Sequence, residues 1–472
     1  MSLLYLPQEI LMLIISELRH ADDLDAMAKL CQTSKTVCAR IQPELFRQFP
    51  KCRYFGPIRL PSYRDGMGTL MFFIKTVIER PELGACVREL VLETFNHRFG
   101  KPGDKEIELQ KDSMEIVLRA YNHLPAHWRQ RYPPSAVGIR TNPLLMLLIT
   151  LTPNLEALEL HDAKEEGLEG LELLWERRSQ GIRRSGYLSN LKKLGIFEER
   201  IMTHKSMKNL IHLMRLPKLD EFYMTCADEH APGCPPFDRL RPESLSITIL
   251  DLVRCTFHQT TMRQLVRACK RLKVFCFSWA VYRTCTHDSR LKRSDIVSVL
   301  EPHQSSLEHM VLDFEDHEPI RESPDESQYA SFTAFTSLKV LMLEQCGIQD
   351  VADLPDSLER LELLSCNRPV YAFLASLIST SKNGRLRLKS FRIEERWFKH
   401  TEDQNLILGI RPTHELKRTE EGELAMMEAC RRLDDLIKTA DFSVEIIFCS
   451  AWKIYVAEQE TIKRGAVADN TA

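Results

Sequence analysis

Cys226, His230 and Cys234 lie close together in the sequence, and Cys255 and His258 follow downstream. Thiolates and imidazoles are the ligands that zinc prefers, so these residues could in principle form a metal site. Their intervals, however, match none of the regular zinc-binding patterns. The sequence favours a thiol at a strand end followed by a proline-rich loop, and we expect no metal or other cofactor.

Motifs for hydrolytic or nucleotide chemistry are absent from the sequence. A serine hydrolase would carry its nucleophile in a G-x-S-x-G elbow, and a nucleotide-binding protein a G-x-x-x-x-G-K-[ST] or G-x-G-x-x-G loop. We therefore expect a chain without catalytic activity of its own. The alternative, a cysteine-dependent enzyme, would require an exposed thiol of low pKa.

The charge and hydropathy of the chain argue against two classes of partner. A net charge of −2 provides no overall basic field for nucleic acid or an anionic membrane. The longest apolar block, Leu144 to Ile149, is far shorter than the roughly 20 residues of a membrane-spanning helix. The N-terminal apolar run is interrupted by Gln8, Glu9 and Glu17, which is not typical of a secretion signal. We expect a cytoplasmic or nuclear protein whose fourteen cysteines form no disulfides.

An apolar-x-x-apolar-x-apolar pattern recurs through most of the chain. Its ten copies begin at Val87, Leu155, Leu191, Leu219, Ile247, Leu272, Leu307, Leu338, Leu358 and Leu388. The last two apolar residues of a copy alternate along a short strand and face inward, while the first turns the chain into that strand. Helical patterns, such as 203–215 and 261–271, lie between the strands. Neighbouring copies would share one continuous core.

This pattern resembles the leucine-rich repeat, in which strands line the inside of a curved solenoid and helices cover its outside. Between residues 96 and 141 the pattern is replaced by a charged stretch with a helical segment near 113–122, which indicates an insertion. A charged helical run at 420–439 and an apolar strand pattern at 442–448 predict a cap for the last repeat.

The N-terminal residues predict three short helices. Pro7 suits a first helical turn, and Glu9 places negative charge at the positive end of the helix dipole. Asp22 or Asp23 can cap a second helix, and Ser34 a third that we expect to end near Pro43. The first helix carries apolar residues on more than one face, as a helix does that packs on its own domain and also on a partner.

This segment resembles an F-box of the fungal type. The residues that carry the resemblance are Leu6, Pro7, Glu9, Ile10, Ile14, Leu18, Leu24, Leu30 and the run Gln42-Pro43-Glu44-Leu45-Phe46. Val37 departs from the pattern, since many F-boxes carry a larger residue there. The resemblance implies that the first eight of these residues contact a Skp-family adaptor and, through it, a cullin–RING ubiquitin ligase. An ordinary N-terminal helical hairpin is the alternative.

The residues between the inward-facing leucines should point to the concave face of the solenoid, where a partner would bind. The predicted substrate-binding residues are Glu159, Tyr223, Asp251, Asp313, Met342, Glu344, Glu362 and Glu394. Nine carboxylates are expected on this face against three cations, Lys193, Arg360 and Arg392, so a partner with a basic segment is favoured. Changing Glu344 and Glu362 to lysine should then weaken capture without harming the fold.

Together the patterns predict a mixed α/β (α+β) chain. Its parts are a three-helix F-box (1–50), a linker or N-terminal cap (51–84), an irregular leucine-rich-repeat solenoid (85–396), a C-terminal capping helix and strand (397–463) and a disordered tail (464–472). The implied role is that of the substrate-recognition subunit of a Skp–cullin–F-box ubiquitin ligase. The alternative is a non-catalytic repeat scaffold without a role in ubiquitination.

Overall fold

The computed structural model divides the chain into two compact units, Met1–Thr225 (unit 1) and Cys226–Ala472 (unit 2). The residues that the structure describes are 7–20, 24–49, 63–93, 115–122, 124, 129–130, 141–161, 187–197, 210–227, 229, 237, 239–279, 291–314, 328–348, 350–364, 370–393 and 420–446. Within these residues the chain has mixed helix and strand content, and its strands are parallel.

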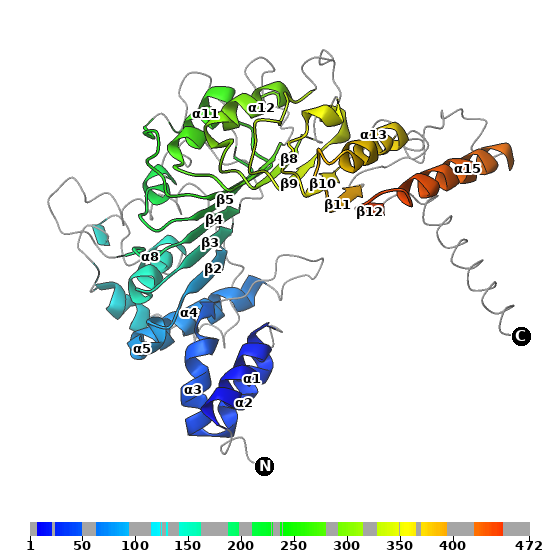
Figure 1. The fold of residues 1–472 in the computed structure, drawn as a ribbon. Coiled ribbons are helices and arrows are strands. Elements are labelled where there is room, and N and C mark those ends of the chain that lie inside the picture. The colour runs from blue at the N-terminus through cyan, green and yellow to red at the C-terminus, as the bar shows by residue number, and fades with distance from the viewer. Residues whose placement is uncertain are drawn as a thin grey trace, which may run out of the picture. The chain divides into compact units, whose positions relative to one another are not determined.

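Unit 1 begins with three helices (Figure 1): α1 (Gln8–His20), α2 (Leu24–Thr33) and α3 (Lys35–Leu45). Their core consists of Leu11, Ile15, Met27, Val37 and Ile41, all buried. Ser34 caps α3 as predicted, because its hydroxyl accepts a 3.1 Å hydrogen bond from the backbone N–H of Val37. The predicted caps of α2, Asp22 and Asp23, lie outside the described residues.

The third helix ends near Pro43 as expected, two residues beyond the proline. Pro43 lies inside α3, which continues to Leu45. A proline lacks only its own N–H, and the backbone N–H of Phe46 still reaches the carbonyl of Gln42 at 3.0 Å. A proline in the last turn therefore does not stop this helix.

Five strands of unit 1 pair in chain order: β1 (Gln48–Phe49), β2 (Glu89–Glu93), β3 (Ala157–His161), β4 (Lys193–Phe197) and β5 (Glu221–Thr225). The helices between them include α4 (Tyr63–Glu79), α5 (Pro81–Gly84) and α8 (Thr141–Leu151). The apolar block Leu144 to Ile149 is part of α8 and is fully buried. Its length and burial fit a core helix.

Seven strands of unit 2 also follow chain order: β6 (Ile249–Val253), β7 (Val274–Ser278), β8 (His309–Asp313), β9 (Val340–Leu343), β10 (Arg360–Leu363), β11 (Ser390–Ile393) and β12 (Ser443–Ile446). Longer helices between them are α11 (Gln259–Ala268), α12 (Arg293–Leu300), α13 (Val370–Lys382) and α15 (Glu420–Ile437). Short 3-10 helices are η5 (Glu301–His303), η6 (Gln345–Gly347) and η7 (Val351–Asp353). Figure 1 shows α11 and α12 side by side on the same side of the strands.

Each of the ten predicted repeat copies contains a strand, and within each unit neighbouring strands pair so that equivalent residues stand opposite one another. Leu250, Phe275 and Met310, the first inward-facing residues of three successive copies, are register partners and are all fully buried. The residues that alternate with them are half-buried, as the period of two requires. We call the surface formed by these alternating residues the strand face of each unit.

The helix and strand predicted near the C-terminus are also present. α15 ends at Ile437 rather than Thr439, and β12 pairs with β11. Within the predicted insertion, residues 115–122 are helical. The predicted tail at 464–472 lies outside the described residues.

Among the described helices, none combines the length and apolarity that crossing a bilayer requires.

Candidate functional site

The first candidate surface is the outer side of α1. Ile10, Met12 and Leu13 are 42%, 41% and 60% exposed, whereas Leu11 and Ile15 on the other side of the helix are buried in the three-helix core. Ile10 and Leu13 are three residues apart and therefore lie next to each other on the helix surface. An apolar patch that its own domain leaves in water is typical of a contact site for another protein.

The structure separates the predicted adaptor-contacting residues into two groups. Pro7, Glu9 and Ile10 are exposed, and Ile14 is half-buried. Leu18 and Leu30 instead pack against the three-helix core, so they stabilise the unit. Leu6 and the side chain of Leu24 lie outside the described residues. Met12 and Leu13 were not in the predicted set, although the three-residue spacing from Ile10 to Leu13 indicated a shared face.

The second candidate surface is the strand face of unit 1. The Lys193 ammonium lies 2.7 Å from the Glu159 carboxylate and 4.9 Å from the centre of the Tyr223 ring. The Tyr223 hydroxyl donates a 3.0 Å hydrogen bond to Glu221. The predicted residues Glu159 and Tyr223 are therefore brought together, and Lys193 joins them through an ion pair and a cation–π contact.

Gly195 stands between these side chains in the register, opposite Glu159 and Tyr223. A Cβ atom at this position would come within 2.5 Å of the Phe197 ring, so the glycine makes room for that ring. Phe197 in turn stacks on His161 with ring centres 4.8 Å apart. The result is a half-buried group of aromatic and charged side chains, a composition common in protein-binding surfaces.

On the strand face of unit 2, Glu362 is buried, whereas the sequence predicts that its carboxylate is exposed. Its side chain is only 1% exposed because Arg360 lies 2.8 Å away and Arg392 lies 3.9 Å away, on the neighbouring strand. The residue is on the predicted face but is covered by the two cations. It cannot serve as an available acidic contact for a partner.

The prediction that Glu344 lies on the strand face is also wrong, because the residue is buried and follows the end of β9. It follows the last residue of β9, and its carboxylate accepts hydrogen bonds from the Tyr329 hydroxyl (2.7 Å) and from the backbone N–H of Phe314. Arg293 lies 3.7 Å away. Lysine at Glu344 would therefore disrupt the core, and the expectation that charge reversal at Glu344 and Glu362 spares the fold is wrong.

Of the remaining predicted residues on this face, Asp251, Asp313 and Met342 are half-buried on their strands. Burial raises the pKa of the Asp251 carboxyl to about 6. Glu394 lies outside the described residues. Glu344 and Glu362 are buried, and Glu159 forms an ion pair with Lys193. The strand faces therefore offer fewer available carboxylates to a partner than the sequence predicts.

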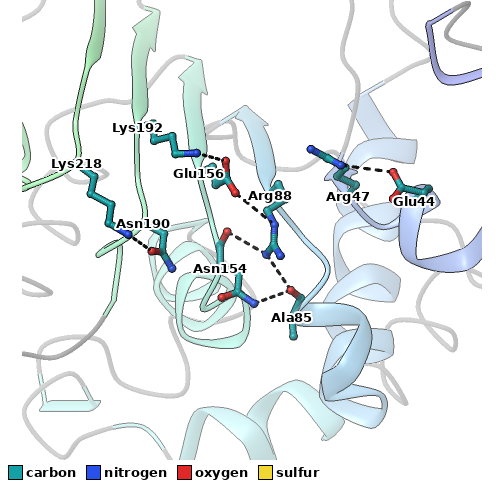
Figure 2. Close-up of polar contacts among 9 residues, drawn as sticks. All are labelled: Glu44, Arg47, Ala85, Arg88, Asn154, Glu156, Asn190, Lys192 and Lys218. Atoms are coloured by element: carbon teal, nitrogen blue, oxygen red, sulfur yellow. Dashed lines mark hydrogen bonds and ion pairs between the residues drawn. The ribbon is translucent and has the colours of Figure 1, made fainter. Parts of the chain in front are cut away.

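In unit 1, alternating charges follow the edge at which the strands begin (Figure 2). Glu156 pairs with Arg88 at 3.5 Å and with Lys192 at 2.8 Å, each from the neighbouring strand start. In unit 2 the same position gives the pairs Lys339–Glu308 and Lys389–Glu359. Slipping one strand against its neighbour would misalign these charges, so the pairs favour the observed register.

Replacing Glu156 by glutamine should therefore lower the free energy of unfolding by about 0.5 kcal/mol, since both of its ion pairs are partly exposed. Its hydrogen bond to Lys192 lowers the pKa of the Glu156 carboxyl. The contribution is thus present above the ordinary glutamate pKa and is lost as the pH falls through the lowered value. Urea unfolding at low salt and in about 1 M NaCl measures it, and an equal loss in both salts would contradict an ionic origin.

The metal interpretation of Cys226, His230, Cys234, Cys255 and His258 finds no support in the part of the chain that the structure describes. No group of three potential ligands forms there. His230 and Cys234 lie outside the described residues, so the prediction for them stays untested. Cys226 directly follows β5, is buried and has a φ of 56°, in agreement with a structural position at a strand end.

Comparison with protein-family models and with curated proteins finds no match to this chain. Its family is therefore not established by similarity.

Proposed function

We propose that this protein is the substrate-recognition subunit of a Skp–cullin–F-box type ubiquitin ligase. The observation that carries the proposal is the exposure of three apolar side chains of α1, Ile10, Met12 and Leu13, on a three-helix unit whose sequence resembles an F-box. Docking on a Skp-family adaptor would bury these side chains. The adaptor would connect the chain to a cullin–RING ligase.

We further propose that the repeated strands form a leucine-rich-repeat solenoid, with α15 and β12 as its C-terminal cap. The in-register parallel pairing within each unit, one strand per repeat copy, supports this interpretation. The strand faces would hold the target protein. They offer half-buried aromatic and charged side chains such as Tyr223, Phe197 and Lys193.

In this role the chain contributes positioning. Holding a target near the ubiquitin-carrying subunit raises the effective concentration of the two reactants, and this accelerates transfer without a reacting group on this chain. The rate would then depend on how firmly α1 holds the adaptor and the strand faces hold the target.

The test is co-purification of the full chain with a Skp-family adaptor. Changing Leu13 to serine removes a large exposed apolar side chain that docking would bury, so the affinity should fall roughly tenfold. Phe72→Ser is the matched control, because Phe72 on α4 is 45% exposed yet lies outside the three-helix unit. Isothermal titration calorimetry, or a pull-down at a series of adaptor concentrations, measures the affinity of both variants.

If the folded wild-type chain fails to bind the adaptor, the ligase proposal is wrong. Equal losses in the Leu13 and Phe72 variants would show that α1 is not the docking surface. Adaptor binding without cullin recruitment or ubiquitination would favour the alternative function, an interaction scaffold built on the same repeat.

A further inference from the structure

On β6 and β8 of unit 2, two polar atoms of the strand face are buried without a hydrogen-bond partner among the described residues. They are Oδ1 of Asp251 on β6 and Nε2 of His309 on β8. Buried polar atoms in folded proteins are nearly always paired, so each exception calls for an explanation. A bound partner that supplies the missing contacts is one such explanation.

The neighbours of Asp251 within unit 2 do not neutralise it. Its register partner on β7 is Cys276, and burial together with the charge of Asp251 raises the pKa of that thiol to about 12. The thiol therefore stays uncharged at neutral pH. The two arginines of this face, Arg360 and Arg392, stand on β10 and β11 and lie against Glu362. Asp251 thus offers a negative charge that the described residues of unit 2 leave uncompensated.

The strands next to Asp251 present apolar side chains in the same register row. Cys276 on β7 is followed by Val311 on β8 and Met342 on β9, all half-buried. His309 lies beside Val311 on β8, in the adjacent row. Burial, and to a lesser extent Arg360, lowers the pKa of its imidazole, so the ring is neutral at pH 7. Its Nε2 is buried and makes no hydrogen bond to a described residue.

We propose that this row binds an extended protein segment in which a lysine or arginine contacts Asp251 and an apolar residue packs on Val311 and Met342. The inference rests on the proposed function and names the class of target segment that the receptor recognises. His309, which stands between the two ends of the row, would hydrogen-bond the backbone of the segment. Complementary charge selects the cation, because no described cation of unit 2 pairs with the Asp251 carboxylate.

The spacing of the strands sets the spacing of the recognised residues. Neighbouring strands lie about 4.8 Å apart, so the three steps from β6 to β9 span about 14 Å. An extended segment advances about 3.3 Å per residue, and the cation and the apolar residue should therefore be roughly four positions apart.

The experiment measures binding of labelled peptides to the full chain by fluorescence anisotropy. The probe carries the sequence Gly-Lys-Ala-Ala-Ala-Leu-Gly, and the comparison peptides have glutamate for the lysine, serine for the leucine, or a single alanine between them. The wild-type chain should bind the probe at least tenfold more tightly than each comparison peptide. Asp251→Asn, which keeps the shape but removes the charge, should weaken probe binding at least tenfold.

Glu445→Gln is the matched control, because Glu445 stands in the same register row on β12 but its carboxylate is 65% exposed. It should leave probe binding unchanged. The proposal is overturned if the wild-type chain binds no peptide up to millimolar concentration, if Asp251→Asn has no effect, or if both variants weaken binding equally. Because adaptor binding uses α1 and is measured separately, these outcomes leave the test of the ligase role independent.

Discussion

Replacing Glu344 by alanine is expected to lower the free energy of unfolding by about 3–5 kcal/mol. The carboxylate is 1% exposed and accepts hydrogen bonds from the Tyr329 hydroxyl and the Phe314 backbone N–H, and it lies 3.7 Å from Arg293. Alanine would remove the acceptor of two buried donors and the carboxylate nearest to a buried guanidinium. Urea unfolding of the full chain, followed by circular dichroism, measures the loss.

Glutamine at the same position is the matched control. Its carbonyl oxygen can accept from Phe314, and its amide can donate to the Tyr329 oxygen, so the loss should be about 1 kcal/mol. Equal losses in the two variants would show that the charge, and not the hydrogen bonding, stabilises this part of unit 2. A loss below about 1 kcal/mol for alanine would contradict the buried network altogether.

The physical role of Glu344 is visible in the backbone of the preceding strands. Cys255, two residues after the end of β6, donates its backbone N–H to the carbonyl of Ser278. Trp279, the first residue after β7, donates its backbone N–H to the carbonyl of Asp313. After β8 the corresponding N–H, that of Phe314, meets the Glu344 side chain. The carboxylate thus takes the place of a backbone acceptor where the strand pairing ends.

The strands could be predicted from the sequence because their apolar residues follow one rule throughout. In every copy two residues of period two must face the core, and Leu250, Leu252, Phe275 and Phe277 do so in the structure. This pattern depends only on which residues are buried, and the apolar periodicity of a single sequence indicates those residues. Ser34 at the start of α3 could be predicted from a different local rule, because a serine at this position can accept a hydrogen bond from the backbone of the first turn.

Exposure of the charged residues could not be predicted in the same way. Glu362 has the alternation of a strand-face residue, but its exposure depends on Arg392 from another repeat, about thirty residues away in the chain. Glu344 lies one residue beyond β9, where the chain enters η6 and the period of two no longer applies. The apolar pattern of one repeat shows neither the ion pairs that cover Glu362 nor the end of the strand before Glu344.

Changing Asp251 to asparagine is expected to stabilise the protein at pH 7.5 by about 3 kcal/mol. Burial raises the pKa of this carboxyl from 3.8 to about 6, so the folded state binds its proton more tightly than the unfolded state. The stability that this group contributes is therefore complete below about pH 3.8 and is lost as the pH rises through about 6. Unfolding curves of both chains from pH 4 to pH 8 measure the difference.

Near pH 4 the two chains should be equally stable, because a protonated carboxyl and an amide are then alike in charge and shape. An asparagine variant that is less stable at pH 7.5 would show that Asp251 has a stabilising partner, and this would remove the argument for a bound cation. A gain in stability together with a loss of peptide binding is the combination expected of a binding residue. The buried carboxylate, whose Oδ1 has no hydrogen bond from the described residues, weakens the free protein and also attracts the partner.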